Sequence, residues 1–362
     1  MSDELPDRVR KGRGAVSNRV GRFEAHARAR VDDGWGVPDG EDADPPPLAT
    51  VLGVDASRTI LTTNDSPDIP FERSINPYKG CEHGCIYCFA RPTHAYLGLS
   101  PGLDFETRIF WKPNGPDLLE KALRAPGYTP QMIALGANTD PYQPVERRLG
   151  LTRRLLEVLA AHNHPVGIIT KSALVLRDLD ILAPMSAKGL VTVCLSVTTL
   201  DRELARRMEP RASTPARRIA ALRELSAAGV RTAVLASPMI PSLTDHELER
   251  ILEAGAEAGA TAANYILLRL PREIADLFDE WLRAHAPDRA ERVLSLIRQS
   301  RDGELYRGRF GERMSGTGPY AALLARRFDL ACKRLGLNKR RWDLRTDLFA
   351  PPPRPGDQMR LL

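Results

Sequence analysis

Three cysteines lie within eight residues of this 362-residue chain, in the order Cys81, Cys85 and Cys88. Three thiols this close together cannot all pair as disulfides, since one is always left over, but they can converge on a metal. A structural zinc site takes four protein ligands, and an iron–sulfur cluster is usually held by four thiolates. No second Cys-x-x-Cys pair supplies a fourth ligand, so the set predicts a metal centre with one open position, suited to chemistry. The alternative is a zinc site completed by His83 or His94.

The longer string from Ser74 to His94 resembles the signature of the radical S-adenosylmethionine enzymes, and within them the branch related to spore photoproduct lyase. The resemblance implies that the three cysteines hold a 4Fe-4S cluster whose open iron chelates S-adenosylmethionine. It also implies that an external donor of the flavodoxin or ferredoxin type supplies an electron. That electron cleaves S-adenosylmethionine to a 5′-deoxyadenosyl radical, which abstracts hydrogen from a substrate.

Short apolar runs alternate with helical patterns from about residue 70 onward. The runs predict six strands, at Ile109–Trp111, Met132–Leu135, Val166–Ile169, Val191–Val197, Thr232–Leu235 and Tyr265–Leu268. They recur at intervals of about thirty residues, the length of a strand–helix unit, and so predict a parallel sheet covered by helices. Periodicity alone leaves a doubly wound sheet open. The family resemblance implies an open partial (β/α)6 barrel of the radical S-adenosylmethionine type over residues 70–270.

Ligands of parallel α/β folds bind at the carboxyl ends of the strands, so the expected cofactor contacts are taken from those positions. Lys171 directly follows one strand, where its ammonium group can meet an anion, and the resemblance implies that the anion is the methionine carboxylate. Alternation along residues 191–199 directs Ser196 into the barrel. By resemblance, Tyr87 packs on the adenine. The full set of expected cofactor contacts is Tyr87, Asn138, Thr139, Lys171, Ser196 and Ser237.

The sequence says less about the residues that act on the substrate. In the related lyase a cysteine near the end of the second strand returns a hydrogen atom to the product, but the stretch Leu135–Thr139 contains no cysteine. Tyr142 and Glu146 are the polar residues nearest the expected site, and we expect one of them to handle a proton or a hydrogen atom. Arg211 either brings a guanidinium group to the site or is structural.

The formal charge of +6 is unevenly placed along the chain. Eight basic residues and one acidic residue lie between Arg8 and Arg30, and eight basic against two acidic residues lie between Arg326 and Arg345. Basic ends of this kind can attract DNA or RNA, although the excess of arginine can also reflect genome composition. No apolar run reaches the roughly 20 residues of a membrane helix, and unpaired cysteines predict a reducing cytoplasm.

Four regions follow from composition. Residues 1–50 are basic, then acidic and proline-rich, and predict a flexible extension. Residues 70–270 form the barrel, residues 271–350 a cap of amphipathic helices, and residues 351–362 a proline-rich tail. The last five residues, Gln358–Leu362, resemble peptides that dock on the bacterial sliding clamp.

These observations together predict a cytoplasmic radical S-adenosylmethionine enzyme whose substrate is nucleic acid, as in photoproduct lyase-like DNA repair or modification. One alternative is a radical enzyme that acts on a small molecule or a protein. The other is a non-catalytic iron–sulfur protein that binds DNA or senses redox state, which the open iron position disfavours.

Overall fold

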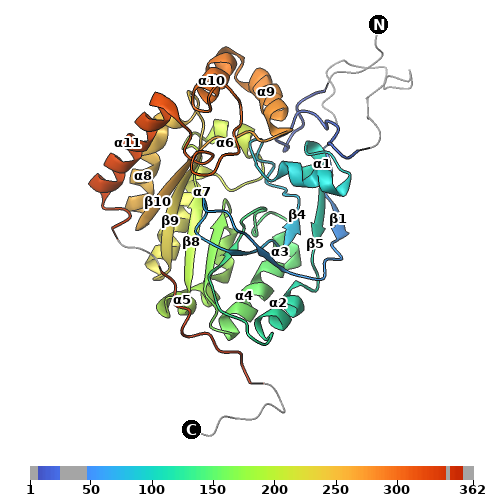
Figure 1. Cartoon of the computed structure of the whole chain (residues 1–362), viewed down its shortest axis with the longest axis vertical. Coiled ribbons are helices and arrows are strands. Elements are labelled where there is room, and N and C mark those ends of the chain that lie inside the picture. Colours follow the sequence, from blue (N-terminus) through green and yellow to red (C-terminus); the bar gives the residue numbers. More distant parts are fainter. Residues whose placement is uncertain (1–6, 25–46, 340–342, 354–362) are drawn as a thin grey trace.

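The computed structural model describes residues 7–24, 47–339 and 343–353 (Figure 1). Its strands are β1 (Val51–Val54), β2 (Leu61–Thr63), β3 (Arg73–Ile75), β4 (Tyr78–Lys79), β5 (Arg108–Trp111), β6 (Ile133–Leu135), β7 (Val166–Thr170), β8 (Val191–Ser196), β9 (Arg231–Met239) and β10 (Ala262–Leu267). Its α-helices are α1 (Leu103–Thr107), α2 (Gly115–Leu123), α3 (Glu146–Leu149), α4 (Leu151–Ala161), α5 (Leu179–Ala187), α6 (Arg202–Met208), α7 (Pro215–Ala227), α8 (Leu248–Glu257), α9 (Ile274–His285), α10 (Pro287–Gln299) and α11 (Gly318–Leu335). Three short 3-10 helices are η1 (Arg91–Leu97), η2 (Ala173–Asp178) and η3 (Asp245–Glu247).

The larger sheet has the strand order β10-β9-β8-β7-β6-β3-β2. Six of these strands, β3 and β6 to β10, run parallel, and β2 pairs antiparallel with β3. Within the described residues β2 and β10 are the two edges of the sheet, so it does not close into a barrel. The predicted α/β class and open six-stranded parallel architecture are therefore confirmed.

The first strand of that sheet differs from the prediction. Ile109–Trp111, expected as the first barrel strand, belongs to β5, which lies in a separate three-stranded sheet between β1 and β4. The first parallel strand is β3 instead. Because β3 has three residues and begins with Arg73, it shows no apolar run, and only its pairing with β2 and β6 makes it a strand.

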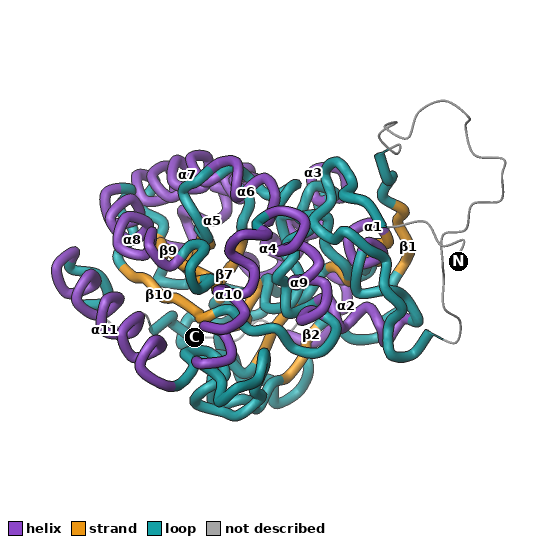
Figure 2. The backbone as a smooth tube through the Cα atoms, turned by 90° about the horizontal axis from the view of Figure 1, so that it is seen from above, coloured by secondary structure: helices purple, strands orange, loops and turns teal. Residues whose placement is uncertain are grey.

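Helices α5, α7 and α8 pack against strands β8 and β9, and α11 lies outside α8 at the β10 edge (Figures 1 and 2). The apolar side chains of these strands and helices form one large buried core. A second buried core lies beneath α9 and α10 and includes Phe278 and Trp281. Cys85, Ile86 and Tyr87 also belong to the second core, so the C-terminal cap packs on the cysteine loop itself.

The N-terminal residues that the structure describes are packed, whereas we expected a flexible extension over residues 1–50. Arg13, Ala15 and Ser17 are buried, and this stretch lies beside α1 and α9 (Figure 1). Arg19 pairs with Asp276 of α9 at 3.0 Å. The basic composition that predicted flexibility is met by acidic partners far along the chain. Residues 1–6 and 25–46 lie outside the described residues.

Two further predictions concern the C-terminal peptide and the lack of a membrane helix. The clamp-like peptide Gln358–Leu362 lies outside the described residues. Among the helices that the structure does describe, none has the length and apolar character to cross a membrane.

Candidate active site

The three predicted ligand cysteines share one loop, which runs from β4 to η1. None of the five cysteines is in a disulfide. Cys81 and Cys85 are buried and Cys88 is half-buried. The loop turns sharply at Gly84, where φ is +68° and a Cβ atom would lie 2.7 Å from a carboxylate oxygen of Glu106. A side chain at this position is therefore excluded by both backbone conformation and space.

Arg91 holds the backbone of the loop from within. Its guanidinium group donates to the carbonyls of Cys85 at 2.9 Å and Gly84 at 3.1 Å. Its charge is balanced by Glu106 at 2.5 Å, and both side chains are fully buried. A buried pair of this kind contributes only when both members are present, because either one alone is an uncompensated buried charge.

The N-terminal stretch completes this network. The backbone N–H groups of Gly14 and Ala15 donate to the two carboxylate oxygens of Glu106, at 2.9 and 2.8 Å. Arg13 donates to the Glu106 carbonyl at 2.8 Å. At Gly14 a Cβ atom would lie 1.8 Å from the Gly84 carbonyl oxygen, so the two backbones touch. Residues 13–15 therefore brace the cysteine loop through Glu106.

The segment after β6 braces the loop from the opposite side. Thr139 donates to the Tyr78 carbonyl at 2.8 Å. Gln143 donates to the Gly80 carbonyl at 3.2 Å and accepts from the Glu82 N–H at 2.9 Å. The sequence singled out this segment for cofactor contacts, and in the structure the side chains of Thr139 and Gln143 bond to the loop.

Asp140 joins that segment to the loop and to β7. Its carboxylate lies 3.3 Å from the His83 ring, and it accepts from the Thr170 hydroxyl and the Lys171 N–H, both at 2.7 Å. Burial alone would raise the pKa of Asp140, but His83 and these hydrogen bonds lower it to about 2. From the sequence, the alternative to a functional segment here is a turn set by two prolines, and neither interpretation predicts this role of Asp140.

The donor set fits an iron–sulfur cluster. Burial, then Asp140 and the other two thiols, raise the pKa of Cys81 well above its usual range. Burial and Glu209 are the main causes that raise the pKa of Cys85 to about 12, against the lowering effect of Lys171. The thiols of Cys81 and Cys85 thus stay protonated until a metal displaces their protons.

Within the described ranges no three His, Cys, Asp or Glu side chains are grouped as ligands of a metal ion. Each thiolate of an iron–sulfur cluster binds its own iron atom, which is a wider arrangement than ligands around a single ion. The histidines of the zinc alternative are engaged elsewhere: His83 with Asp140, and His94 with the Arg108 carbonyl at 3.0 Å. Three thiols and no histidine are therefore the available donor set.

A second group of polar side chains meets the loop at Tyr87. Its hydroxyl donates to Glu209 and lies 3.1 Å from the Thr198 hydroxyl. Glu209 also pairs with Arg218, and all four side chains are buried. Burial would raise the pKa of Glu209, but Arg218 and then Lys171 are the main causes that lower it to about 2. The expected adenine contact, Tyr87, is thus fixed by a buried carboxylate.

Lys171 reaches this group from the end of β7. Its Nζ lies 5.8 Å from the centroid of the Tyr87 ring, and its charge lowers the pKa of both Cys85 and Glu209. The ammonium group makes no hydrogen bond or ion pair with any residue the structure describes. The structure therefore brings an unpaired cation to the cysteine loop.

Two other predicted cofactor contacts, Ser196 and Ser237, meet this group through their backbone carbonyls, whereas Asn138 bonds elsewhere. The Ser196 carbonyl accepts from Arg218 at 2.9 Å, and the Ser237 carbonyl accepts from Thr198 at 3.1 Å. The Asn138 N–H donates to the Asn76 side chain at 2.9 Å. Thr198, Glu209 and Arg218 were not selected from the sequence, because no local pattern connects a strand end to a carboxylate eleven residues later.

Tyr142 and Glu146, expected to handle a proton or a hydrogen atom, are both buried. Glu146 is fully buried, accepts from Tyr78, and pairs with Arg177 at 2.8 Å. Tyr142 packs in the large core, where burial and nearby Asp178 raise its pKa well above the usual range. These partners are consistent with a positioning role behind the loop. Arg211 is paired with Glu82 at 2.7 Å and so braces the loop as well.

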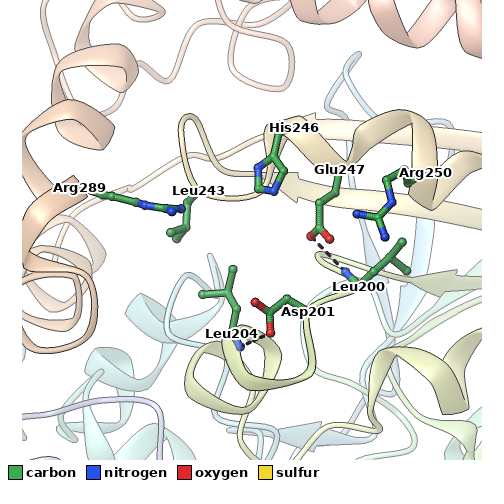
Figure 3. A pocket seen from close by; sticks show the side chains of 8 residues that line it. All are labelled: Leu200, Asp201, Leu204, Leu243, His246, Glu247, Arg250 and Arg289. Carbon is green, nitrogen blue, oxygen red and sulfur yellow. Dashed lines mark hydrogen bonds between the residues drawn. The ribbon is translucent and has the colours of Figure 1, made fainter.

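A pocket of about 410 Å³ lies beyond the ends of β8 and β9 (Figure 3). Arg250, Arg289 and His246 line it together with Asp201 and Glu247. Asp201 accepts from the Leu204 N–H at 3.1 Å and Glu247 from the Leu200 N–H at 3.1 Å. Both carboxylates therefore already accept hydrogen bonds from backbone N–H groups. None of the cysteines lines this pocket, and we do not assign the chemistry to it.

An open parallel α/β barrel with three free cysteines on one loop defines the class of protein. The sequence model of the Radical SAM superfamily matches residues 75–255. That span is half of the chain and contains the cysteine loop and the four parallel strands β6 to β9. The protein belongs to the Radical SAM superfamily and is a radical SAM enzyme.

The chain is also similar in sequence to uncharacterised proteins. An uncharacterised protein of Mycobacterium tuberculosis strain H37Rv is 39% identical over 233 residues, covering 64% of this chain and 68% of that protein. An uncharacterised protein of Methanocaldococcus jannaschii is 31% identical over 173 residues, covering 48% and 62%.

Among solved structures, a spore photoproduct lyase variant with bound S-adenosylmethionine and dinucleoside spore photoproduct matches with a TM-score of 0.58. The sequence identity is 16%, and the match covers 80% of each chain. Another spore photoproduct lyase structure, complexed with the dinucleoside spore photoproduct, matches with a TM-score of 0.57 at 16% identity over the same shares. At such identities the likeness establishes the fold.

Proposed function

We propose that this enzyme binds a 4Fe-4S cluster through Cys81, Cys85 and Cys88 and uses S-adenosylmethionine to start a hydrogen abstraction on nucleic acid. When bound, the cluster supplies the electron that cleaves S-adenosylmethionine to a 5′-deoxyadenosyl radical. A donor of the flavodoxin or ferredoxin type delivers that electron. The proposal includes a cytoplasmic location, since all five cysteines are free and a reducing compartment keeps them so.

The proposal depends most on the position of Lys171. Its ammonium group is unpaired among the described residues and lies over the Tyr87 ring, and its charge lowers the pKa of Cys85. An ammonium group binds a carboxylate as a point charge and does not require the fixed fork geometry of arginine. Lys171 is therefore suited to hold the methionine carboxylate beside the open iron position.

Tyr87 and its hydrogen-bond partners form a fixed surface against which the cofactor can pack. Because Glu209 and Thr198 both bond the Tyr87 hydroxyl, the ring is fixed before any ligand arrives. Polar backbone and side-chain groups at the other strand ends complete the expected cofactor contacts, at Asn138, Thr139, Ser196 and Ser237. We assign them to cofactor binding together with Tyr87 and Lys171.

The nucleic-acid substrate is supported by charge and by likeness. The chain carries a formal charge of +6, and basic surfaces attract the phosphate backbone. The spore photoproduct lyase of similar fold was solved with a dinucleoside photoproduct. Since the stretch Leu135–Thr139 lacks a cysteine, we do not extend the proposal to repair of that dimer by the same hydrogen return.

Anaerobic reconstitution with iron and sulfide, followed by dithionite and S-adenosylmethionine, tests the proposal. We expect 5′-deoxyadenosine, even in slow turnover without substrate, and none from Cys88→Ala. Absence of 5′-deoxyadenosine from the reconstituted wild-type protein would contradict it. Comparison of modified nucleosides in DNA and RNA from wild-type and deletion cells then tests the substrate; identical profiles would favour a small-molecule or protein substrate.

A further inference from the structure

The surface beside the third cysteine combines an exposed aromatic ring with an arginine. Phe89 directly follows Cys88 and is 43% exposed. The guanidinium carbon of Arg269, two residues beyond the end of β10, lies 4.6 Å from the centroid of the Phe89 ring. The end of the last parallel strand and the cysteine loop therefore meet at this pair.

Apart from the Phe89 ring, the guanidinium group of Arg269 has no polar partner among the described residues. It makes no hydrogen bond or ion pair with any residue in the described ranges, although it is only half-exposed. Burial is the main cause that lowers the pKa of Arg269. Tyr306, Cys88 and Asp68 raise this pKa, and Arg313 lowers it. An arginine held in this way is a donor that lacks an acceptor.

More positive charge surrounds the pair. Arg301, 2% exposed, donates to the carbonyls of Leu267 and Leu268 at 3.2 and 2.9 Å. Burial and then Arg269 lower the pKa of Arg301 to about 10, which leaves it charged at neutral pH. Of the arginines at positions 269, 301 and 313, only Arg313 is paired with a carboxylate of a described residue, that of Asp68.

A second aromatic–arginine pair borders the first. Arg313 lies 4.9 Å from the centroid of the Phe310 ring, and Phe310 is 57% exposed. The loop that carries both is tied down, because Asp68 pairs with Arg313 and accepts from the Gly311 N–H at 2.7 Å. This surface is therefore built before any ligand binds.

We propose that this surface, made of Phe89, Arg269, Phe310 and Arg313, binds an unpaired nucleotide of a single strand. An exposed ring stacks on any base, and guanidinium groups bind the phosphates that flank it. A paired base offers no free face for stacking. The inference rests on the proposed nucleic-acid substrate and names the form in which it is presented, beside Cys88.

Fluorescence anisotropy of the full-length protein, without reconstitution, tests the inference. The probes are a fluorescein-labelled oligothymidylate, the same strand in a duplex, and free thymidine monophosphate as a competitor. We expect tighter binding of the single strand than of the duplex and weak competition by the mononucleotide. Phe89→Ala should weaken single-strand binding by roughly tenfold, and Arg269→Ala should also reduce the salt slope by about one.

Matched controls guard against general effects. Arg250→Ala removes an exposed arginine of the other pocket (Figure 3), and Leu330→Ala removes a 59% exposed apolar side chain of α11. Both should bind as the wild type does, and thermal unfolding should match for all four variants. Wild-type affinity in Phe89→Ala and Arg269→Ala, an equal loss in Arg250→Ala, or a preference for duplex would overturn the inference.

The outcomes separate this inference from the proposed function. Binding through Phe89 by a protein that yields no 5′-deoxyadenosine would keep the inference and refute the radical chemistry. Formation of 5′-deoxyadenosine without single-strand binding would support the radical chemistry and refute the inference.

Discussion

The cysteine loop is bonded very differently on its two sides. Toward the N-terminal stretch, Arg91 and Glu106 are fully buried and engaged by protein groups. Toward the barrel opening, Lys171 and Arg269 present cations that pair with no described residue. A saturated buried network fixes a backbone, whereas an unpaired cation at an opening is available to a ligand. The first side therefore fixes the backbone of the cysteine loop, and we propose that the second binds cofactor and substrate.

The largest effect should come from breaking the saturated side. Glu106→Gln leaves Arg91 buried without a counter-charge, which typically costs about 3–5 kcal/mol. We expect the free energy of unfolding in urea to fall by that amount and the iron content after reconstitution to fall with it.

Asp180→Asn is the matched control for that change. Asp180 pairs with Arg153, but its side chain is 60% exposed, so its loss should leave the free energy of unfolding nearly unchanged. Equal stability of Glu106→Gln and Asp180→Asn would mean that the brace does not hold the loop.

The next effect should appear as a pH dependence at Glu209, which bonds Tyr87 of the cysteine loop. Its pKa falls from the ordinary 4.5 to about 2 in the folded protein, so its contribution is present above pH 4.5 and lost as the pH falls toward 2. The size is on the order of 3 kcal/mol. We expect the difference in unfolding free energy between wild type and Glu209→Gln to narrow from pH 5 to pH 2. A difference that stays constant over this range would show that Glu209 is not held ionised.

The sequence predicts the parts of this account that depend on local pattern. The cysteine spacing predicts the metal loop, and the apolar runs of β6 to β10 predict most of the parallel sheet. Lys171 could be selected because it directly follows such a run. Each of these signals lies within a few consecutive residues.

The remaining features depend on contacts between distant segments. Strand β3 is three residues long and pairs with a strand some sixty residues later. Residues 13–15 bind Glu106, which lies more than ninety residues away. Composition alone predicted a flexible stretch there, because no local pattern indicates that a buried carboxylate elsewhere will accept its N–H groups.

Lys171 tests the central claim, that the unpaired side of the loop binds the ligands. S-adenosylmethionine binding should be measured by equilibrium dialysis with anaerobically reconstituted wild type, Lys171→Met, and the control Lys188→Met, whose ammonium group bonds Asn163 at 2.7 Å. Loss of one charge-assisted contact, about 1.5 kcal/mol, predicts roughly tenfold weaker binding by Lys171→Met at unchanged iron content. Lys188→Met should bind as the wild type does. Wild-type affinity in Lys171→Met would contradict the account.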